Sequence, residues 1–533
     1  MRTQIVNRPG ELINSHCGLI LVLFVSLTLK IVELLYLDII SPDSARYIAA
    51  AHMFIKGDFW KGVALYRLPA YPLLLAFFYM LVGSWKGAGI ITSLLPTLGT
   101  TVSIYLISAR LFSHRAAFWS ATAFALSPYL NRYGLYMIRD PMFWFLTSWA
   151  LYFGIRFLEQ PDERFLLGCL GTALLAAGFR VEGVIFLSVY LWFLVYAAVR
   201  GGKECHVYLS GAALWFLFPL LVAAGLYYLF GSKWSHLTRI DNIVGMVRNT
   251  LSSKFLDHYL KIYNDIKNLQ LTHGYSIHSI QGHSVLTITR HYMPLIYMIG
   301  ILECFFRMLY PLYGIPLIAG LKTKLDRRRA LPLVTGLALI MVCYLFLIEK
   351  DYVAKRYLGL PVICLLPWVG EGMERIIKGV KDSLSGRLVI TLSIGLFFVL
   401  PIWKCASLNM RKIEPTLMEA GHWIASTPAL ANLPLEASDN RILIYAGHPE
   451  AFPEKGLPPA IKQLVSLGFA KSEKEKIVVI NPPGEETFSK GLPEGYTILK
   501  SFRGNYYSVT VYGPSQLKPL VDGSGGLPQP DDL

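Results

Sequence analysis

Runs of about 20 apolar residues recur along most of this chain, with short polar segments between them. A helix of that length spans the hydrocarbon core of a bilayer, because it rises about 1.5 Å per residue. Of the 533 residues, 54% are hydrophobic and 16% are charged, and the mean hydropathy is +0.46. Soluble globular chains carry about 25% charged residues. The sequence therefore predicts an α-helical polytopic membrane protein.

Eleven of these runs are predicted to be transmembrane helices. A further run, 71–85, is apolar but short, and Pro69 and Pro72 stand near its start. We interpret it as a re-entrant or interfacial segment; if it crossed the bilayer, every later loop would change sides. The eleven predicted spans are residues 17–37, 88–109, 116–136, 141–158, 165–179, 183–199, 207–230, 292–319, 330–348, 357–370 and 388–404.

The basic residues indicate how the chain is oriented. The formal net charge of +15 would suggest a nucleic-acid partner for a soluble protein. In a membrane protein, Lys and Arg instead gather in cytoplasmic loops and near anionic lipid head groups, so no nucleic-acid partner is expected. The densest short clusters, 322–329 and 375–387, are cytoplasmic if the N-terminus is cytoplasmic and eleven spans follow.

This topology places the polar loop after the first span, 38–87, on the outer side. The loop keeps basic residues such as Arg46 and Arg67, against the tendency of positive charge to stay in the cytoplasm. We interpret that exception as a sign that the loop needs positive charge for its own function. The same outer face receives Asp43, Asp140, Arg180, Glu182, Lys355 and Arg356.

Two domains are predicted. Residues 1–404 form the membrane module, with long outer loops at 38–87 and 231–291, and residues 405–533 form a small extracytoplasmic α/β domain. The final stretch of this tail is expected to be disordered. In the tail, strands are predicted at 441–447, 476–480, 496–502 and 506–512, and helices at 418–425 and 460–467.

Histidines and cysteines do not predict a metal site. Loop 231–291 contains six histidines, but His273, His278 and His283 recur every five residues, a poor match to helical ligand pairs at i and i+4. The seven cysteines form no CxxC pair, so no metal-ligating residues are predicted. No glycine-rich loop stands in a context that would bind a soluble nucleotide.

Two aspartates at the outer face are candidate catalytic residues. Asp43 opens a segment, 43–57, with helical spacing of its apolar residues, and Asp140 precedes Pro141 at the start of a span. Either carboxylate could simply cap the N-terminus of its helix. Ionisable groups close to hydrocarbon are costly, however, and are usually kept for a task. Such a carboxylate could accept a proton from a hydroxyl or hold a divalent cation against a phosphate.

Charged residues at two later span boundaries allow two interpretations each. Arg180 and Glu182 interrupt apolar sequence, either as an ion pair at a helix break or because the arginine offers a planar fork to a phosphate. Lys355 and Arg356 precede a span together with Tyr357, either as snorkelling interfacial residues or as a second cationic contact to a phosphate head group.

Several short motifs appear in a particular order. They are the outer aspartate, RLPAYPLLLAFFY (67–79), RDP (139–141), GFRVEG (178–183), KRYLGLP (355–361) and EAGHWIAST (419–427). Together they resemble the GT-C superfamily of membrane glycosyltransferases, which use polyprenyl-phosphate sugars. The likeness extends over about residues 15–430 and points to the protein O-mannosyltransferase and lipid A aminoarabinose transferase groups.

The resemblance implies roles for individual residues. Asp43 matches the essential acidic residue of the first outer loop, and Asp140 matches an aspartate after the third span. Arg356 and Tyr357 match an Arg-Tyr pair beside the donor phosphate. Ser44 follows Asp43 where mannosyltransferases have an Asp-Glu pair. Residues 67–69 read Arg-Leu-Pro where the related groups have Glu-Lys-Pro or His-Pro-Pro, so the acceptor is left open.

The resemblance thus predicts a GT-C fold with about 11 spans and an inverting transfer of sugar from a polyprenyl-phosphate donor to an acceptor hydroxyl on a lipid, glycan or protein. Asp43 would activate the acceptor. The enzyme would lie in the bacterial inner membrane with an extracytoplasmic active site, and the resemblance does not decide whether it needs a divalent cation. A lipid or solute transporter or flippase is the alternative, but no internal repeat is visible. The predicted substrate-binding residues are Arg46, Tyr47, Arg67, Arg180, Glu182, Lys355, Arg356 and Tyr357.

Overall fold

The computed structural model divides into two compact units. The first comprises Met1–Leu35, Ser93–Leu135 and Arg139–Met410, and the second Tyr36–Thr92, Tyr136–Ile138 and Arg411–Leu533. Residues 36–92 thus group with the C-terminal residues, and the domain boundaries drawn from the sequence remain a prediction. The structure describes residues 9–200, 205–231, 245, 248–249, 252, 256–272, 285–379, 384–409, 415–453, 477–480, 496–504 and 508–522.

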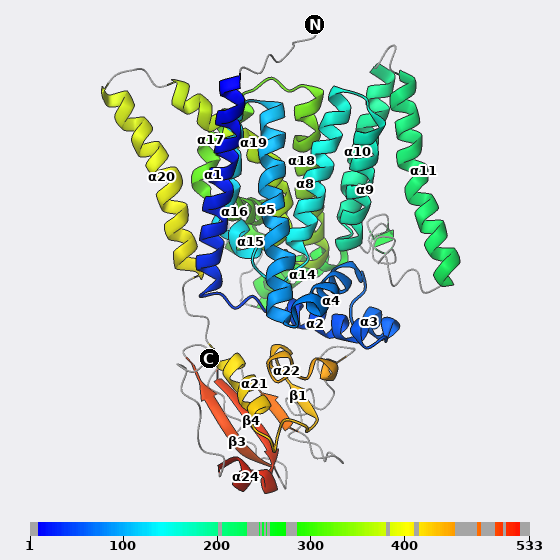
Figure 1. Cartoon of the computed structure of the whole chain (residues 1–533), viewed down its shortest axis with the longest axis vertical. Coiled ribbons are helices and arrows are strands. Elements are labelled where there is room, and N and C mark those ends of the chain that lie inside the picture. Colours follow the sequence, from blue (N-terminus) through cyan, green and yellow to red (C-terminus); the bar gives the residue numbers. More distant parts are fainter. Residues whose placement is uncertain are drawn as a thin grey trace. The chain divides into compact units, whose positions relative to one another are not determined.

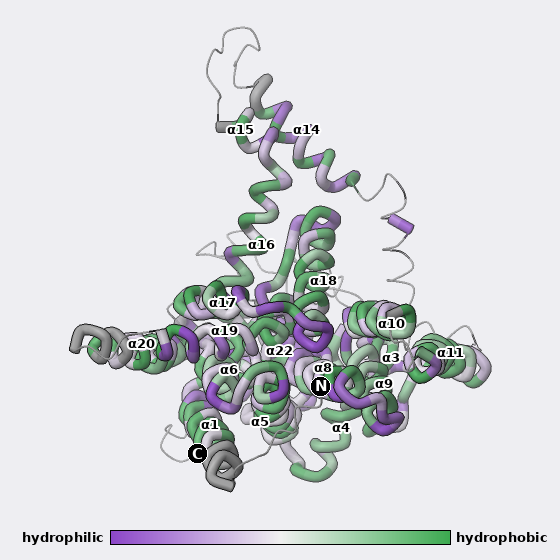
Figure 2. Tube along the Cα trace, turned by 90° about the horizontal axis from the view of Figure 1, so that it is seen from above, coloured by the Kyte–Doolittle hydropathy of each residue, from purple (hydrophilic) through white to green (hydrophobic). Residues whose placement is uncertain are grey.

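The first unit is built from helices. Consecutive pairs among α8, α9, α10 and α11 pack against each other and stand side by side in Figure 1. The tube of α10 is mainly hydrophobic in Figure 2. The helices are α1 (Pro9–Leu34), α5 (Trp85–Leu111, whose first turns belong to the second unit), α6 (His114–Leu126), α7 (Pro128–Tyr133), α8 (Asp140–Glu159), α9 (Glu163–Phe179), α10 (Gly183–Arg200), α11 (Cys205–Phe230), α14 (Asp257–Thr272), α15 (Val285–His291), α16 (Met293–Leu309), α17 (Gly314–Leu321), α18 (Arg327–Lys350), α19 (Gly359–Gly379) and α20 (Leu384–Asn409).

Five of the described helices are long and apolar enough to cross a membrane, and six if one bent pair is counted as a span. The protein is therefore a multi-pass membrane protein, and the number of eleven spans remains a prediction. The five segments are Cys17–Leu34, Trp85–Leu111, Cys205–Phe230, Arg327–Lys350 and Thr391–Leu408.

The prediction of one continuous span at 292–319 is wrong. The chain forms α16 and then a second helical segment, Pro311–Leu321, and the two are bent by 94°. The break lies at Tyr310, whose φ is +75°, and at Pro311, which has no amide hydrogen to continue a helix. Apolar content alone gave no sign of this bend.

Glycines bring α19 into backbone contact with its neighbours. A Cβ on Gly372 would lie 1.7 Å from the carbonyl oxygen of Pro316, and one on Gly320 would lie 1.9 Å from that of Trp368. These distances are far below van der Waals contact, so α17 and α19 can cross this closely only because both positions lack a side chain.

A polar cluster lies inside the first unit, between α1 and α7. Lys30 Nζ donates to Asn131 Oδ1, and Asn131 Nδ2 donates to Glu33 Oε2. All three side chains are buried. The two opposite charges on α1, one turn apart, are therefore joined through an amide on another helix, which compensates their removal from water.

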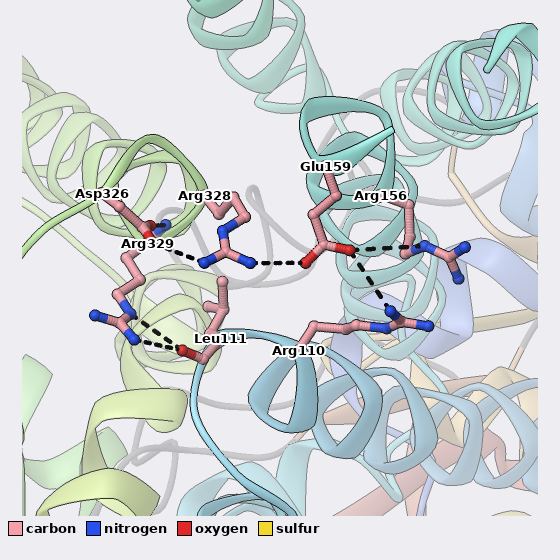
Figure 3. A network of polar contacts seen from close by, with 7 residues as sticks. All are labelled: Arg110, Leu111, Arg156, Glu159, Asp326, Arg328 and Arg329. Atoms are coloured by element: carbon pink, nitrogen blue, oxygen red, sulfur yellow. Dashed lines mark hydrogen bonds and ion pairs between the residues drawn. The ribbon is translucent and has the colours of Figure 1, made fainter. Parts of the chain in front are cut away.

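Arginines join the ends of α5, α8 and α18 (Figure 3). Glu159 Oε2 lies 3.7 Å from Arg110 Nη1 and 3.8 Å from Arg156 Nε, and its Oε1 lies 3.2 Å from Arg328 Nη1. Arg329 donates through Nε and Nη2 to the carbonyl oxygen of Leu111, at 3.0 and 2.9 Å. This arginine thereby satisfies a carbonyl at the C-terminal end of α5 that the helix itself leaves open. The basic cluster predicted from residues 322–329 thus has a structural role as well.

The second unit begins with α2 (Pro42–Ile55), α3 (Phe59–Leu65) and α4 (Ala70–Val82). The predicted helix after Asp43 is confirmed, but the interpretation of Asp43 as its cap is wrong. Ser41 is the N-cap and forms a capping box with Ser44, which places Asp43 inside the first turn. The short run at 71–85 forms α4, which has 13 residues and is therefore shorter than a full span.

The rest of this unit contains a four-stranded sheet with the order β1-β2-β4-β3. Strand β1 (Leu435–Ala437) pairs parallel with β2 (Ile477–Ile480), and β4 (Ser508–Pro514) runs antiparallel to β2 and to β3 (Tyr496–Arg503). The predicted strands at 476–480, 496–502 and 506–512 are confirmed, and so is the helix at 418–425, which is α21 (Thr416–Ser426).

One predicted strand of the tail is wrong. Residues 441–447 contain the short helix α22 (Arg441–Tyr445), because Asp439 Oδ1 accepts the amide of Arg441 and turns the chain. The helix predicted at 460–467 lies outside the described residues.

Candidate active site

A cavity of about 550 Å³ lies within the first unit. Its wall is formed by the N-terminal end of α8, the turn between α9 and α10, the C-terminal half of α18 and the 3-10 turn η5 (Lys355–Leu358) before α19. Residues far apart in the sequence therefore meet at one place. Five predicted site residues line it: Asp140, Arg180, Glu182, Arg356 and Tyr357.

Arg180 is the centre of a buried ionic cluster in this wall. Its Nη1 lies 2.5 Å from Asp140 Oδ1, its Nη2 lies 2.5 Å from Glu182 Oε1, and its Nε lies 3.3 Å from Glu182 Oε2. The side chains of Arg180 and Asp140 are only 3% and 2% exposed. Burial opposes charge here, but the guanidinium outweighs it and lowers the pKa of Glu182 to about 2.

The local sequence explains why Arg180 takes this position. Arg180 ends α9 with an extended backbone, at φ −145° and ψ 132°, and Gly183 begins α10 directly afterwards. A Cβ on Gly183 would lie 2.7 Å from the amide nitrogen of Ala177, so the turn is tight enough to exclude other residues. The cluster therefore projects from a helix break, as one interpretation of the sequence suggested.

Aromatic rings also contact this guanidinium. Arg180 Cζ lies 4.7 Å from the ring centroid of Tyr357 and 5.6 Å from that of Phe143. The guanidinium thus contacts two aromatic rings, and all three of its nitrogens donate to carboxylates. The structure therefore shows the ion pair that one interpretation of the sequence suggested, and a contact of Arg180 with phosphate remains a prediction. Arg180 also packs on Tyr357 in the η5 turn.

Four cations and three carboxylates line the cavity, which leaves an excess of one positive charge. Glu349 is paired with Lys350 at 3.0 Å and accepts a hydrogen bond from Asn249 at 3.3 Å. The remaining cations, Arg139 and Arg356, come from the RDP and KRYL motifs. An anionic group would therefore be attracted into this space.

Sequence reasoning missed part of this wall, and one predicted substrate-binding residue lies outside it, so its role remains a prediction. Arg139 is adjacent to Asp140, and Glu349 and Lys350 end the helix that precedes the KRYL motif. These three residues could have been predicted because each is a charged residue close to a motif in the sequence. Lys355 was predicted to bind substrate but is not among the lining residues. Its Nζ lies 5.3 Å from the ring centroid of Tyr129 instead.

The rest of the wall is apolar. It combines aromatic and aliphatic side chains with one thiol, and the cationic groups are gathered near the helix ends. A cavity of this kind suits an amphiphile with an anionic head and a hydrocarbon tail. The apolar lining residues are Phe143, Trp144, Leu339, Val342, Cys343, Phe346 and Leu360.

The other predicted site residues belong to the second unit. Asp43 lies in the first turn of α2, where the helix dipole favours a negative charge. Tyr47 is buried, with ring centroids 4.7 Å from Tyr66 and 5.0 Å from Tyr71. It therefore serves the packing of α2, while Arg46 is exposed.

Arg67 is half-buried in the same unit, in the link between α3 and α4. The convergence of Asp43 and Asp140 at one face of the membrane remains a prediction. Within the described parts of the chain, no group of three or more His, Cys, Asp or Glu side chains is arranged to hold a metal ion.

The fold and the cavity define a class of protein: a multi-pass membrane protein with a partly apolar cavity beside a buried ionic cluster. Residues 67–228 match the family model of dolichyl-phosphate-mannose-protein mannosyltransferases. No curated protein sequence matches the chain.

Solved structures place the fold more closely. ArnT from Cupriavidus metallidurans bound to undecaprenyl phosphate is 14% identical, with a TM-score of 0.55 over 92% of this chain and 97% of that chain. Its apo structure is also 14% identical, with a TM-score of 0.53 over 94% of this chain and 98% of that chain. The chain therefore has a GT-C fold and resembles the ArnT and protein mannosyltransferase groups, which confirms the resemblance inferred from its motifs.

Proposed function

We propose that this protein is a glycosyltransferase that moves a sugar from a polyprenyl-phosphate donor to an acceptor hydroxyl. The observation that carries the proposal is the cavity of the first unit, which joins an apolar wall to an excess of positive charge. An isoprenoid chain with a phosphate head matches both parts of that wall. The match to a mannosyltransferase family model and the fold shared with an undecaprenyl-phosphate-bound ArnT support the same donor class.

In this proposal the phosphate is the leaving group. The bond between the anomeric carbon and the phosphate oxygen breaks as the acceptor oxygen bonds to that carbon from the opposite side, so the configuration inverts. Arg139 and Arg356 stabilise the charge that grows on the departing phosphate. Arg180 keeps Tyr357 and the η5 turn in place, so that Arg356 is preorganised.

Asp43 is the proposed acceptor-activating carboxylate. It accepts the hydroxyl proton as the new glycosidic bond forms, which general-base catalysis by a carboxylate allows. Asp43 lies in the first turn of α2, where the helix dipole favours a negative charge. We further propose that this chemistry takes place on the outer side of a bacterial inner membrane, where the donor head group would be presented.

The proposal is tested by turnover of purified protein in lipid nanodiscs. A panel of undecaprenyl-phosphate sugars (mannose, glucose, galactose and aminoarabinose) is supplied with membrane lipids and glycans as acceptors, and released undecaprenyl phosphate is measured by mass spectrometry. We expect release from at least one donor, with a glycosylated product. A transporter or flippase would leave every donor intact.

The role of Asp43 is tested by Asp43→Asn, with Asp58→Asn as the matched control. Loss of a general base should lower turnover by about 10²–10⁴-fold. Asp58 is an exposed carboxylate of the same region, bonded to Lys61 at 3.0 Å, and its loss should leave turnover unchanged. Full activity of Asp43→Asn would remove Asp43 from the mechanism.

A further inference from the structure

The helix that carries Asp43 is held by side chains from a distant part of the same unit. These come from residues 439–452, here called the clamp segment, which contains α22 and the 3-10 turn η6 (Pro449–Ala451). The clamp segment touches α2 or its leading turn through Tyr445, Glu450 and Phe452. Nothing in the sequence marks these residues as partners, because roughly 400 positions separate them from α2.

The first attachment is at the turn that leads into α2. Tyr445 donates its hydroxyl hydrogen to Asp38 Oδ2, and the other oxygen of Asp38 accepts the amide of Ile40 at 3.0 Å. One carboxylate thus joins the clamp segment to the backbone turn just before the helix. Loss of the phenol would leave a half-buried carboxylate oxygen without this donor.

The second attachment is near the other end of α2. Glu450 Oε2 lies 3.6 Å from Nε2 of His52, and Glu450 Oε1 lies 3.2 Å from Nδ1 of His448. Between the two ends, Arg46 Cζ lies 5.9 Å from the ring centroid of Phe452. The clamp segment therefore forms a hydrogen bond to the turn before α2 and longer contacts with the first half and the last turn of the helix.

The clamp segment is itself firmly packed. A Cβ on Gly421 would lie 2.4 Å from Tyr445 Cβ, so α21 and α22 approach as closely as glycine permits. Ile442 and Leu443 are buried in the core of the C-terminal part of this unit. Arg441 also pairs with Asp439 at 2.7 Å. The side chains that contact α2 thus come from a segment that is packed into the core of this unit.

We infer that the clamp segment positions Asp43, with Tyr445 and Glu450 as positioning residues. Asp43 lies between the attachments at Asp38 and Arg46, and α2 turns by about 100° per residue. A small rotation of the helix would therefore carry the carboxylate away from the acceptor hydroxyl. The inference rests on the proposed function, because it assigns the C-terminal part a role in orienting the acceptor-activating group.

The test compares two positioning variants with two matched controls. Tyr445→Phe removes the phenol that bonds Asp38, and Tyr512→Phe removes a phenol of the sheet. Glu450→Gln removes the charge that faces His52, and Glu419→Gln removes an exposed charge on α21. Each protein is studied in nanodiscs with the donor found by the turnover panel, and hydrogen exchange of amides 44–55 is followed by mass spectrometry.

We expect Tyr445→Phe to lower kcat by about 10-fold or more, because misplacing a reacting group by about 1 Å can cost 10²-fold. The donor KM and the stoichiometry of undecaprenyl phosphate binding should stay unchanged, which excludes partial unfolding. Exchange in α2 should become faster. Glu450→Gln should show the same changes to a smaller extent, and the controls should match the wild type.

Two outcomes would overturn the inference. One is a Tyr445→Phe variant with the kcat and the α2 exchange of Tyr512→Phe. The other outcome concerns a wild type that turns over no donor, a result that would refute the proposed function. Hydrogen exchange alone then tests the clamp segment. Unchanged exchange of α2 in both positioning variants would refute its role. Faster exchange of α2 in those variants would show that the clamp segment holds α2, and only the catalytic role of Asp43 would be rejected.

Discussion

Arg180 shows how far a single residue can be understood from sequence. Its place between apolar runs indicated an ion pair or a phosphate contact, and Glu182 was near enough in sequence to be the partner. Asp140, the other partner, lies 40 positions away on another helix, so its pairing depends on how α8 packs against α9. A buried pair that loses one member is destabilised by about 3–5 kcal/mol. Arg180 is therefore a structural centre of the cavity.

Arg356 and Lys355 allow a test of phosphate binding by a single residue, because these two neighbouring basic residues have different surroundings. Arg356 lines the cavity, whereas Lys355 lies over Tyr129. Arg356→Gln should weaken binding of undecaprenyl phosphate by about 10-fold to 100-fold, since a hydrogen bond to a charged group contributes about 1.5–3 kcal/mol. Lys355→Gln should leave binding unchanged. Titration in nanodiscs checks both, and equal losses would show that the cavity does not hold the phosphate.

At the scale of elements, patterns of apolar residues predicted the helices and strands whose formation depends on local sequence. The strands at 476–480 and 496–502 and the helices α2 and α21 follow from alternation or helical spacing. Residues 441–447 misled because 442–445 form an unbroken apolar run that a buried strand and a buried helix share, while the side chain of Asp439 starts a helical turn. The bend after α16 depends on Tyr310 and Pro311, two residues that are too few to divide the apolar run when hydropathy is averaged over a span.

The crossing of α17 and α19 gives a test of element packing. Gly372→Ala places a methyl group on the carbonyl oxygen of Pro316, so α17 must move, and overpacking of this kind costs about 1–3 kcal/mol. Gly379→Ala meets nothing within 4 Å near the end of the same helix and should be neutral or slightly stabilising. Thermal unfolding in detergent measures both. A Gly372→Ala protein as stable as the wild type would mean that the helices do not cross here.

At the scale of the whole molecule, the sequence located five of the cavity residues but could not show that they share one wall. Asp140, Arg180 and Arg356 stand at helix boundaries, where charge beside an apolar run is conspicuous. Glu349 and Lys350 were missed because a charged end is common in membrane helices. The contacts of the clamp segment could not be predicted from the sequence, since 407 positions separate Tyr445 from Asp38.

The predicted topology is tested with single cysteines in a protein whose seven native cysteines are replaced. Lys61→Cys and Glu419→Cys should react with a membrane-impermeant maleimide on intact cells, because both are exposed and predicted outside. Lys324→Cys and Lys378→Cys should react only after permeabilisation. If the bent pair α16–α17 enters and leaves on one side, Lys324 will instead be labelled on intact cells.

The junction of Lys30 and Glu33 with Asn131 also bears on how the chain is synthesised. The two charges lie in the first apolar segment, and the amide that joins them is 101 residues downstream. Because the chain is synthesised from its N-terminus, this junction can form only after α7 has left the ribosome, so the two charges of α1 gain their amide partner late in synthesis of the first helices.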